Sequence, residues 1–76
     1  MRIRSATGTV LVWHSDVGWG LITSQTVKSE VWAHFSAIDA TGFRELFEGD
    51  AVTFRYHRAR QDGYRFVADS VRRLSP

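Results

Sequence analysis

The most constraining feature of this sequence is a series of short segments with the two-residue periodicity of β-strands, separated by turn-forming residues. Residues 15–18 (Ser-Asp-Val-Gly) and 61–63 (Gln-Asp-Gly) have turn chemistry, and the second of these is typical of a tight hairpin. Short strands at regular spacing favour a small antiparallel barrel or sandwich. The expected strands cover residues 7–14, 19–23, 31–35, 51–58 and 64–73.

The stretches between these strands have different patterns. The polar residues 24–29 predict a loop. Residues 36–39 and 43–46 have the pattern of helical turns, and neither is long enough for a stable helix. We therefore expect an all-β chain.

Length and composition narrow the class of protein. A chain of 76 residues is enough for one domain, so residues 1–76 are expected to form a single domain with a compact core. The chain has no cysteine for a disulfide or a thiolate metal site. No apolar run approaches the ~20 residues of a membrane span, and residues 1–5 lead into no signal-peptide core. We expect a cytoplasmic protein with no membrane partner.

The second and third expected strands carry apolar side chains on both of their sides, although only one side can face a core. The interior of a five-stranded barrel is narrow and suits aliphatic side chains, so the side with Trp19, Leu21, Trp32 and His34 is expected to face outward. The alternative is that these rings are simply core, since large aromatic side chains are usually buried. The predicted core consists of Val10, Ile22, Val31, Ala33, Ile38, Val52, Phe54 and Val71.

An outward cluster of aromatic side chains is unfavourable in water unless it binds something. Nucleobases stack on such rings for about 1–3 kcal/mol each, which points to single-stranded nucleic acid. Residues 55–76 hold six arginines against two aspartates, a net charge of +4, whereas residues 1–54 have a net charge of −2. The basic part suits phosphate contacts, and the alternative is a solvated strand face.

Two motifs resemble the cold-shock domain family. Residues 18–22 (Gly-Trp-Gly-Leu-Ile) resemble its first RNA-binding motif, and residues 31–35 (Val-Trp-Ala-His-Phe) resemble its second. The Ser-Ala-Ile that follows, then Gly42-Phe43, Leu46 and Glu48-Gly49, match the family in order and spacing, as does Gly8-Thr9-Val10 in the first strand. The resemblance covers residues 6–74. It implies a five-stranded antiparallel Greek-key barrel of the oligonucleotide-binding (OB) type, which binds single-stranded DNA or RNA with little sequence preference.

The resemblance also implies the binding residues. Aromatic side chains of the second and third strands stack on bases in this family, with Trp13 flanking the same face and Glu30 near a base edge. Phosphate charge would come from Arg55, His57, Arg58 and Arg60 if the fourth strand and its loop border the site. The predicted nucleic-acid-binding residues are Trp13, Trp19, Leu21, Glu30, Trp32, His34, Phe35, Phe43, Arg58 and Arg60.

The chain departs from the family pattern at four positions of this face. Val17 and Leu11 stand where the family has lysines, and Val12 and Leu21 stand where it has aromatic rings. We therefore expect binding that is weaker or altered relative to a typical member. The alternative function is a protein–protein contact or self-association through an apolar patch. That patch would consist of Leu11, Val12, Trp13, Val17, Trp19 and Leu21.

The sequence shows no constellation typical of an enzyme. The three histidines, His14, His34 and His57, fall on separate expected strands without zinc-site spacing, and the carboxylates show no paired pattern. A small hydrolytic or ligand-binding barrel thus has no supporting residues. We expect a non-enzyme with no catalytic residue, metal, cofactor or small-molecule substrate. Its expected role is that of an RNA chaperone or transcription-linked regulator.

Overall fold

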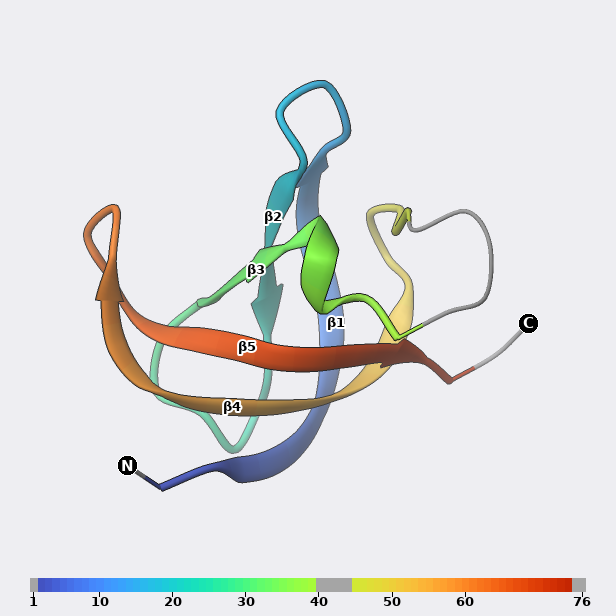
Figure 1. Ribbon diagram of the computed structural model, residues 1–76. Coiled ribbons are helices and arrows are strands. Elements are labelled where there is room, and N and C mark those ends of the chain that lie inside the picture. The colour runs from blue at the N-terminus through green and yellow to red at the C-terminus, as the bar shows by residue number, and fades with distance from the viewer. Residues whose placement is uncertain (1, 40–44, 75–76) are drawn as a thin grey trace.

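A computed structural model describes residues 2–39 and 45–74 of the chain. The chain closes into a five-stranded barrel with the strand order β1-β2-β3-β5-β4 (Figure 1), which confirms the predicted fold class. In the described part, no helix is long and apolar enough to cross a membrane. The elements are β1 (Arg4–His14), β2 (Trp19–Thr23), β3 (Val31–His34), the 3₁₀ helix η1 (Phe35–Ala37), β4 (Ala51–Gln61) and β5 (Tyr64–Arg73).

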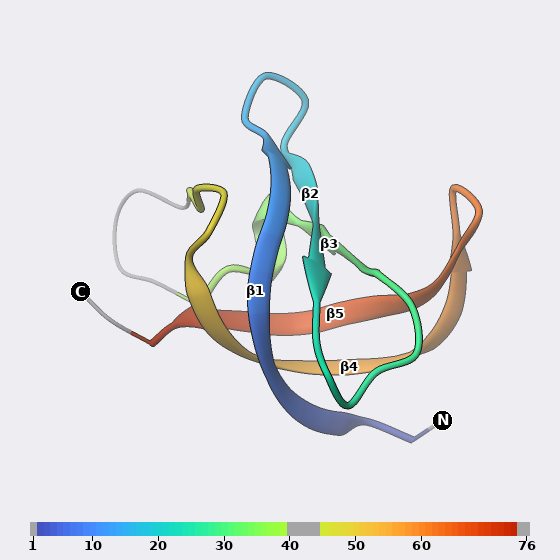
Figure 2. The same cartoon turned by 180° about the vertical axis from the view of Figure 1, so that it is seen from behind.

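Strand β1 connects the two halves of the barrel. Its first part, Arg4 to Thr9, pairs antiparallel with β4, and its second part, Thr9 to His14, pairs antiparallel with β2. In Figure 2, which views the barrel from behind, β1 passes in front of β4 and β5 and then runs beside β2. A bulge between Val10 and Val12 shifts the register where β1 bends.

One contact in the barrel differs from the antiparallel prediction. Strands β3 and β5 run parallel where they meet, and they are paired at Val31–Phe66 and Trp32–Val67. The other four strand contacts are antiparallel. The parallel contact arises because β3 and β5 are distant in sequence and are joined by no hairpin.

The core is mainly aliphatic, as the strand patterns predicted, with the rings of Phe54 and Tyr56 added. All eight predicted core residues are buried, and full burial of such side chains contributes about 1.5–3 kcal/mol each. The structure adds four residues to the core whose burial was not expected. One of them, Val27, lies in the polar segment 24–29 and packs in the core cluster. The further members of the core cluster are Val27, Leu46, Tyr56 and Ala68.

Element boundaries differ from the sequence prediction in four places. Strand β1 begins at Arg4 rather than at residue 7, and β4 continues to Gln61 rather than ending at residue 58. Strand β3 ends at His34, because Phe35 already belongs to η1. The helical turn predicted over 43–46 lies partly outside the described residues, and the described part of it is not helical.

The predicted hairpin between the last two strands is confirmed. Gln61 pairs with Tyr64, so the loop consists of Asp62 and Gly63 alone. Both loop residues have positive φ, 50° and 86°, as a two-residue turn of this type requires. Glycine adopts this region without steric cost, and aspartate is among the few other residues that tolerate it.

Candidate nucleic-acid interface

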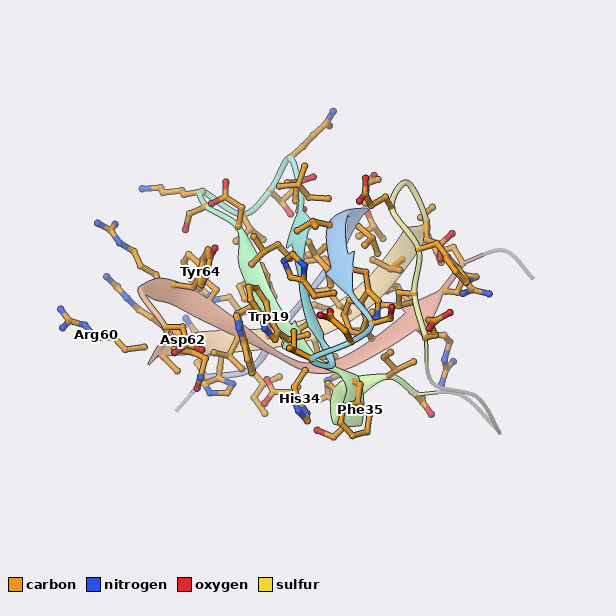
Figure 3. All side chains as sticks on the ribbon, turned by 90° about the horizontal axis from the view of Figure 1, so that it is seen from above. Trp19, His34, Phe35, Arg60, Asp62 and Tyr64 are labelled. Carbon is orange, nitrogen blue, oxygen red and sulfur yellow. The ribbon has the colours of Figure 1, made fainter. Side chains whose placement is uncertain are left out.

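Five aromatic rings form a continuous row over the ends of β1, β2 and β3 and the start of η1. Three of them, Trp19, His34 and Phe35, are labelled in Figure 3. We call this row the aromatic ladder. The ring centroids are 4.6 Å apart for His14–Trp19, 6.2 Å for Trp19–Trp32, 6.0 Å for Trp32–His34 and 4.5 Å for His34–Phe35.

The register of β2 and β3 produces the ladder. Trp19 lies opposite His34, so their side chains emerge on the same face of the sheet. Trp32 lies two residues before His34 on the same strand and therefore shares that face. These three side chains are half-buried, and none of them belongs to the buried core cluster of the described residues. The expectation that the aromatic side faces outward is therefore confirmed for Trp19, Trp32 and His34.

The central rings of the ladder have nearly parallel planes. The planes of Trp19 and Trp32 are 22° apart, and those of Trp32 and His34 are 18° apart. The outer rings are tilted, with 59° between His14 and Trp19 and 44° between His34 and Phe35. Nearly parallel, half-buried rings offer flat apolar surfaces on which bases can stack.

Hydrogen bonding fixes the ring of His34. The backbone N–H of Ser36 donates to Nδ1 of His34 at 3.3 Å, and the Ser36 hydroxyl lies 2.8 Å from the same nitrogen. A backbone N–H can only donate, so Nδ1 is the acceptor and, in the neutral ring, Nε2 carries the proton. The ladder thus presents an N–H donor of defined direction beside the indole of Trp32.

One predicted site residue does not lie where the sequence placed it. Leu21 was expected to be exposed on the aromatic face, and it is buried, with 8% of its surface exposed. Trp13, expected to flank the same face, is half-buried: it pairs with the buried Gly20 and packs against the core, and it also lines a hollow with Phe35 of the ladder. A Cβ on Gly20 would lie 2.3 Å from Cε3 of Trp13, so the missing side chain makes room for this ring.

The loop before β2 is attached to the end of the ladder. The N–H of Phe35 donates to the carbonyl oxygen of Gly18 at 2.8 Å. Gly18 has a φ of +79°, a conformation that L side chains rarely adopt, and a Cβ there would lie 2.8 Å from the Phe35 ring. Phe35 itself is 44% exposed. Trp13, Val17 and Phe35 share the lining of a hollow of about 370 Å³.

Glu30, another predicted contact, is exposed and immediately precedes β3. Phe43 lies outside the described residues. At two of the family departures, Leu11 and Val17, the side chains are 50% and 60% exposed. Exposed aliphatic side chains therefore stand at two positions where the family pattern has lysines, and Val17 lines a hollow with Phe35 of the ladder.

The predicted cations lie on β4, which is separated from Trp32 on β3 by β5. Trp32 pairs with Val67, which pairs with His57 on β4, and Arg58 and Arg60 follow. Both arginines are exposed and line, with Arg65, a surface hollow of about 350 Å³ that we call the hairpin hollow. Figure 3 shows Arg60 projecting on the side of the hairpin.

The other two basic candidates on β4 have different surroundings. Nδ1 of His57 lies 2.8 Å from a carboxylate oxygen of Asp69. Arg55 is exposed opposite Ser5 and Ser70, and it does not line the hairpin hollow. Of the predicted sources of charge, Arg58 and Arg60 are thus the two that the structure brings together.

Comparisons with known proteins agree with the fold and the motifs. The chain matches the family model described as the "'Cold-shock' DNA-binding domain" over residues 6–73. It is 49% identical over 49 residues to the cold shock protein ScoF of Streptomyces coelicolor, a match that covers 64% of this chain and 73% of that protein. It is 44% identical over 48 residues to the cold shock-like protein CspB of Escherichia coli, covering 63% and 68% respectively.

Among solved structures, the chain is similar in fold to the drosophila Unr CSD456. The TM-score is 0.71 at 23% sequence identity, and the match covers 96% of this chain and 28% of that chain. The barrel, the two motifs and the family match over most of the chain together place the protein: it belongs to the cold-shock domain family, whose members bind single-stranded nucleic acid.

Proposed function

We propose that this protein binds single-stranded nucleic acid by stacking bases on the aromatic ladder and placing phosphates near the hairpin hollow. The observation that carries this proposal is the set of nearly parallel rings of Trp19, Trp32 and His34 on the outer face of the β2–β3 pair. The proposed contacts from the described residues outside the ladder are Trp13, Leu21, Glu30, Arg58 and Arg60, with Leu21 acting as a buried support rather than a contact surface.

The proposed energetics are dominated by stacking. Each base on a ring contributes about 1–3 kcal/mol, and the ladder offers three central rings. Few cations border the ladder, so roughly two to four phosphates would be neutralised, at a slope of about −0.7 per phosphate in log K against log salt. Affinity therefore depends only mildly on salt for a short strand.

The proposed role is that of an RNA chaperone or transcription-linked regulator in the cytoplasm. Bases held on the ladder are unavailable for pairing, so binding shifts the equilibrium of weak hairpins toward the open strand without ATP. Residues 1–76 act as one domain in this proposal. Its chemistry is binding alone, and we assign the chain no catalytic residue, metal or cofactor.

Tryptophan fluorescence titration with oligothymidine and with single-stranded RNA tests the proposal. The wild-type protein should be quenched by both ligands. Trp32→Ala should weaken binding at least about tenfold, the equivalent of one lost stacking contact, while its far-ultraviolet circular dichroism remains that of a folded barrel. The two remaining tryptophans, Trp13 and Trp19, preserve the fluorescence signal in this variant.

Phe47→Ala is the matched control. It removes an aromatic ring that is 57% exposed and lies beneath the guanidinium of Arg73, outside the aromatic ladder. Its affinity should equal that of the wild type within about twofold, since no stacking contact is lost. Equal affinities of the wild type and of Trp32→Ala would rule out stacking on the ladder.

The exposed aliphatic side chains support a second candidate function, a protein–protein contact. Leu11 and Val17 are both exposed, as such a patch requires. Burial of Leu21 makes the patch smaller than the sequence suggested. Light scattering of the free protein, beside the oligonucleotide titration, separates the two functions: self-association without quenching would favour the protein contact.

A further inference from the structure

A second concave basic surface lies at the end of the β1–β3 sheet away from η1. Figures 1 and 2 both show the start of β1 and the β2–β3 loop at this end of the barrel. The concavity has a volume of about 660 Å³, and we call it the basal groove. The lining residues that matter here are Arg2, Arg4, Lys28, Tyr56, Arg58 and Phe66.

Two of these cations occupy strand positions that point toward the barrel interior. Arg4 pairs with Tyr56, a member of the buried core cluster, so the two residues occupy the same face of the sheet, although Arg4 is exposed at the end of its strand. Arg58 follows Tyr56 by two residues and pairs with Phe66, which packs against the core. Inward positions of a small barrel are normally filled by apolar side chains. Here they carry guanidinium groups just beyond the last layer of the core.

Four cations of the basal groove, Arg2, Arg4, Lys28 and Arg58, are in none of the ion pairs found within residues 2–39 and 45–74. The one carboxylate paired with a groove residue is that of Asp69, which lies 2.8 Å from Nδ1 of His57. Among the described residues, the lining of the groove includes no aspartate or glutamate. Like charges gathered in one concavity repel one another and attract an anion, so the groove favours a negatively charged ligand.

The floor of the groove is aromatic. The rings of Tyr56 and Phe66 meet edge to face, with centroids 5.7 Å apart and planes at 82°. Guanidinium groups bind phosphate oxygens in a forked geometry, and the apolar floor suits the sugar or base attached to that phosphate. The combination fits a phosphodiester backbone better than a small inorganic anion.

The basal groove is also continuous with the proposed nucleic-acid interface. Trp32 of the ladder is separated from His57, which lines the groove, by β5 alone, so about 10 Å separate the two strands. Arg58 lines both the groove and the hairpin hollow. A strand that leaves the ladder at Trp32 therefore reaches the groove by crossing a single strand of the barrel.

We propose that the basal groove binds the phosphodiester backbone of the same single strand whose bases stack on the aromatic ladder. This inference rests on the proposed function and extends it to Arg2, Arg4 and Lys28. The family match covers residues 6–73, so Arg2 and Arg4 lie outside the matched residues. The groove supplies charge that the substitutions at Leu11 and Val17 remove from the ladder.

The test compares short and long oligothymidines, of about 4 and about 12 nucleotides, the range bound by one OB-type barrel. The double variant Arg4→Gln/Lys28→Gln should bind the short strand like the wild type. It should bind the long strand at least about fivefold more weakly at low salt, and its slope in log K against log salt should be less steep by about 1.4, for two lost phosphate contacts.

The matched control is Arg55→Gln/Arg72→Gln, which removes the same charge from exposed positions that do not line the basal groove. It should keep the wild-type slope for both strands, and melting curves should show that both variants are folded. An equal loss in the two double variants, or a long strand bound no more tightly than a short one by the wild type, overturns the inference alone. Failure of the wild type to bind the short strand overturns the proposed function and, with it, the inference.

Discussion

The indole rings of Trp19 and Trp32 lie with their centroids 6.2 Å apart and their planes 22° from parallel, although they belong to different strands. The antiparallel register of β2 and β3 sets this relationship, since Trp32 lies opposite Leu21, two residues after Trp19. The two rings are therefore held in a nearly parallel arrangement by the pairing of the two strands. A base that stacks on one of them is positioned by the backbone pairing of the sheet.

Substitutions at Trp19 distinguish a stacking platform from a generally apolar surface. Trp19→Phe retains a flat ring and should keep the affinity for oligothymidine within about threefold. Trp19→Leu keeps an apolar side chain without a π face and should lose about 1–3 kcal/mol of binding, a factor of at least about five. Isothermal titration calorimetry of the two variants measures both effects.

The thermal melting curves of the two variants are the control, because they show whether each variant is folded. Trp19 is half-buried and lies outside the core cluster of the described residues, so both variants should fold. If Trp19→Leu bound as tightly as Trp19→Phe, the face would act through apolar contact, as the protein–protein alternative requires.

Gly20→Ala should destabilise the barrel strongly. The added Cβ would lie 2.3 Å from Cε3 of Trp13 and 2.4 Å from the carbonyl oxygen of Val12. The second contact is with backbone, which cannot move without disturbing the β1–β2 pairing, so we expect a loss of about 3 kcal/mol or more in the free energy of unfolding. Urea denaturation measures the loss.

Gly49→Ala is the comparison for this effect. A Cβ at Gly49 meets no atom within 4 Å, although φ is +90°. Its cost should be the backbone strain alone, about 1–2 kcal/mol. If the two alanine variants lost the same free energy of unfolding, Trp13 and the backbone of β1 at Val12 would have to shift readily, contrary to the packing in the structure.

The tautomer of His34 is a further testable consequence. In the neutral ring, ¹⁵N chemical shifts should show a protonated Nε2 and an unprotonated Nδ1, because Nδ1 accepts from the N–H of Ser36. Ser36→Ala removes the hydroxyl partner at 2.8 Å and should weaken oligonucleotide binding about two- to fivefold through a less fixed ring.

Ser36→Thr retains the hydroxyl and serves as the matched variant, with wild-type affinity expected. A protonated Nδ1 in the neutral wild-type ring would contradict the assignment, since that nitrogen could not then accept from a backbone N–H.

The strand pattern was sufficient to predict the core and the outward side of the ladder. Ile22 and Val31 lie on the opposite side of their strands from Trp19 and Trp32. The narrow interior of the barrel accommodates the aliphatic side chains, so the rings face outward. The hairpin followed equally directly from Asp62-Gly63, whose backbone conformation depends on those two residues alone. These features were predictable because they depend on neighbours in sequence.

The packing of Trp13 and Val27 depends on contacts between distant segments. The ring of Trp13 packs against the core because Gly20, on another strand, leaves space for it. The glycines on either side of Trp19, Gly18 and Gly20, were the signal in the sequence for this space. Val27 belongs to a polar loop, and its burial depends on how that loop folds back under the barrel. No local periodicity reports such a contact.

The parallel meeting of β3 and β5 rests on two residue pairs, and Trp32 belongs to one of them. Parallel pairing is slightly less stable per residue than antiparallel pairing. Trp32, on which we propose that a base stacks, is therefore part of the parallel contact that closes the barrel. A ligand that binds only the closed barrel stabilises this contact, so ligand binding and the stability of the barrel are thermodynamically linked.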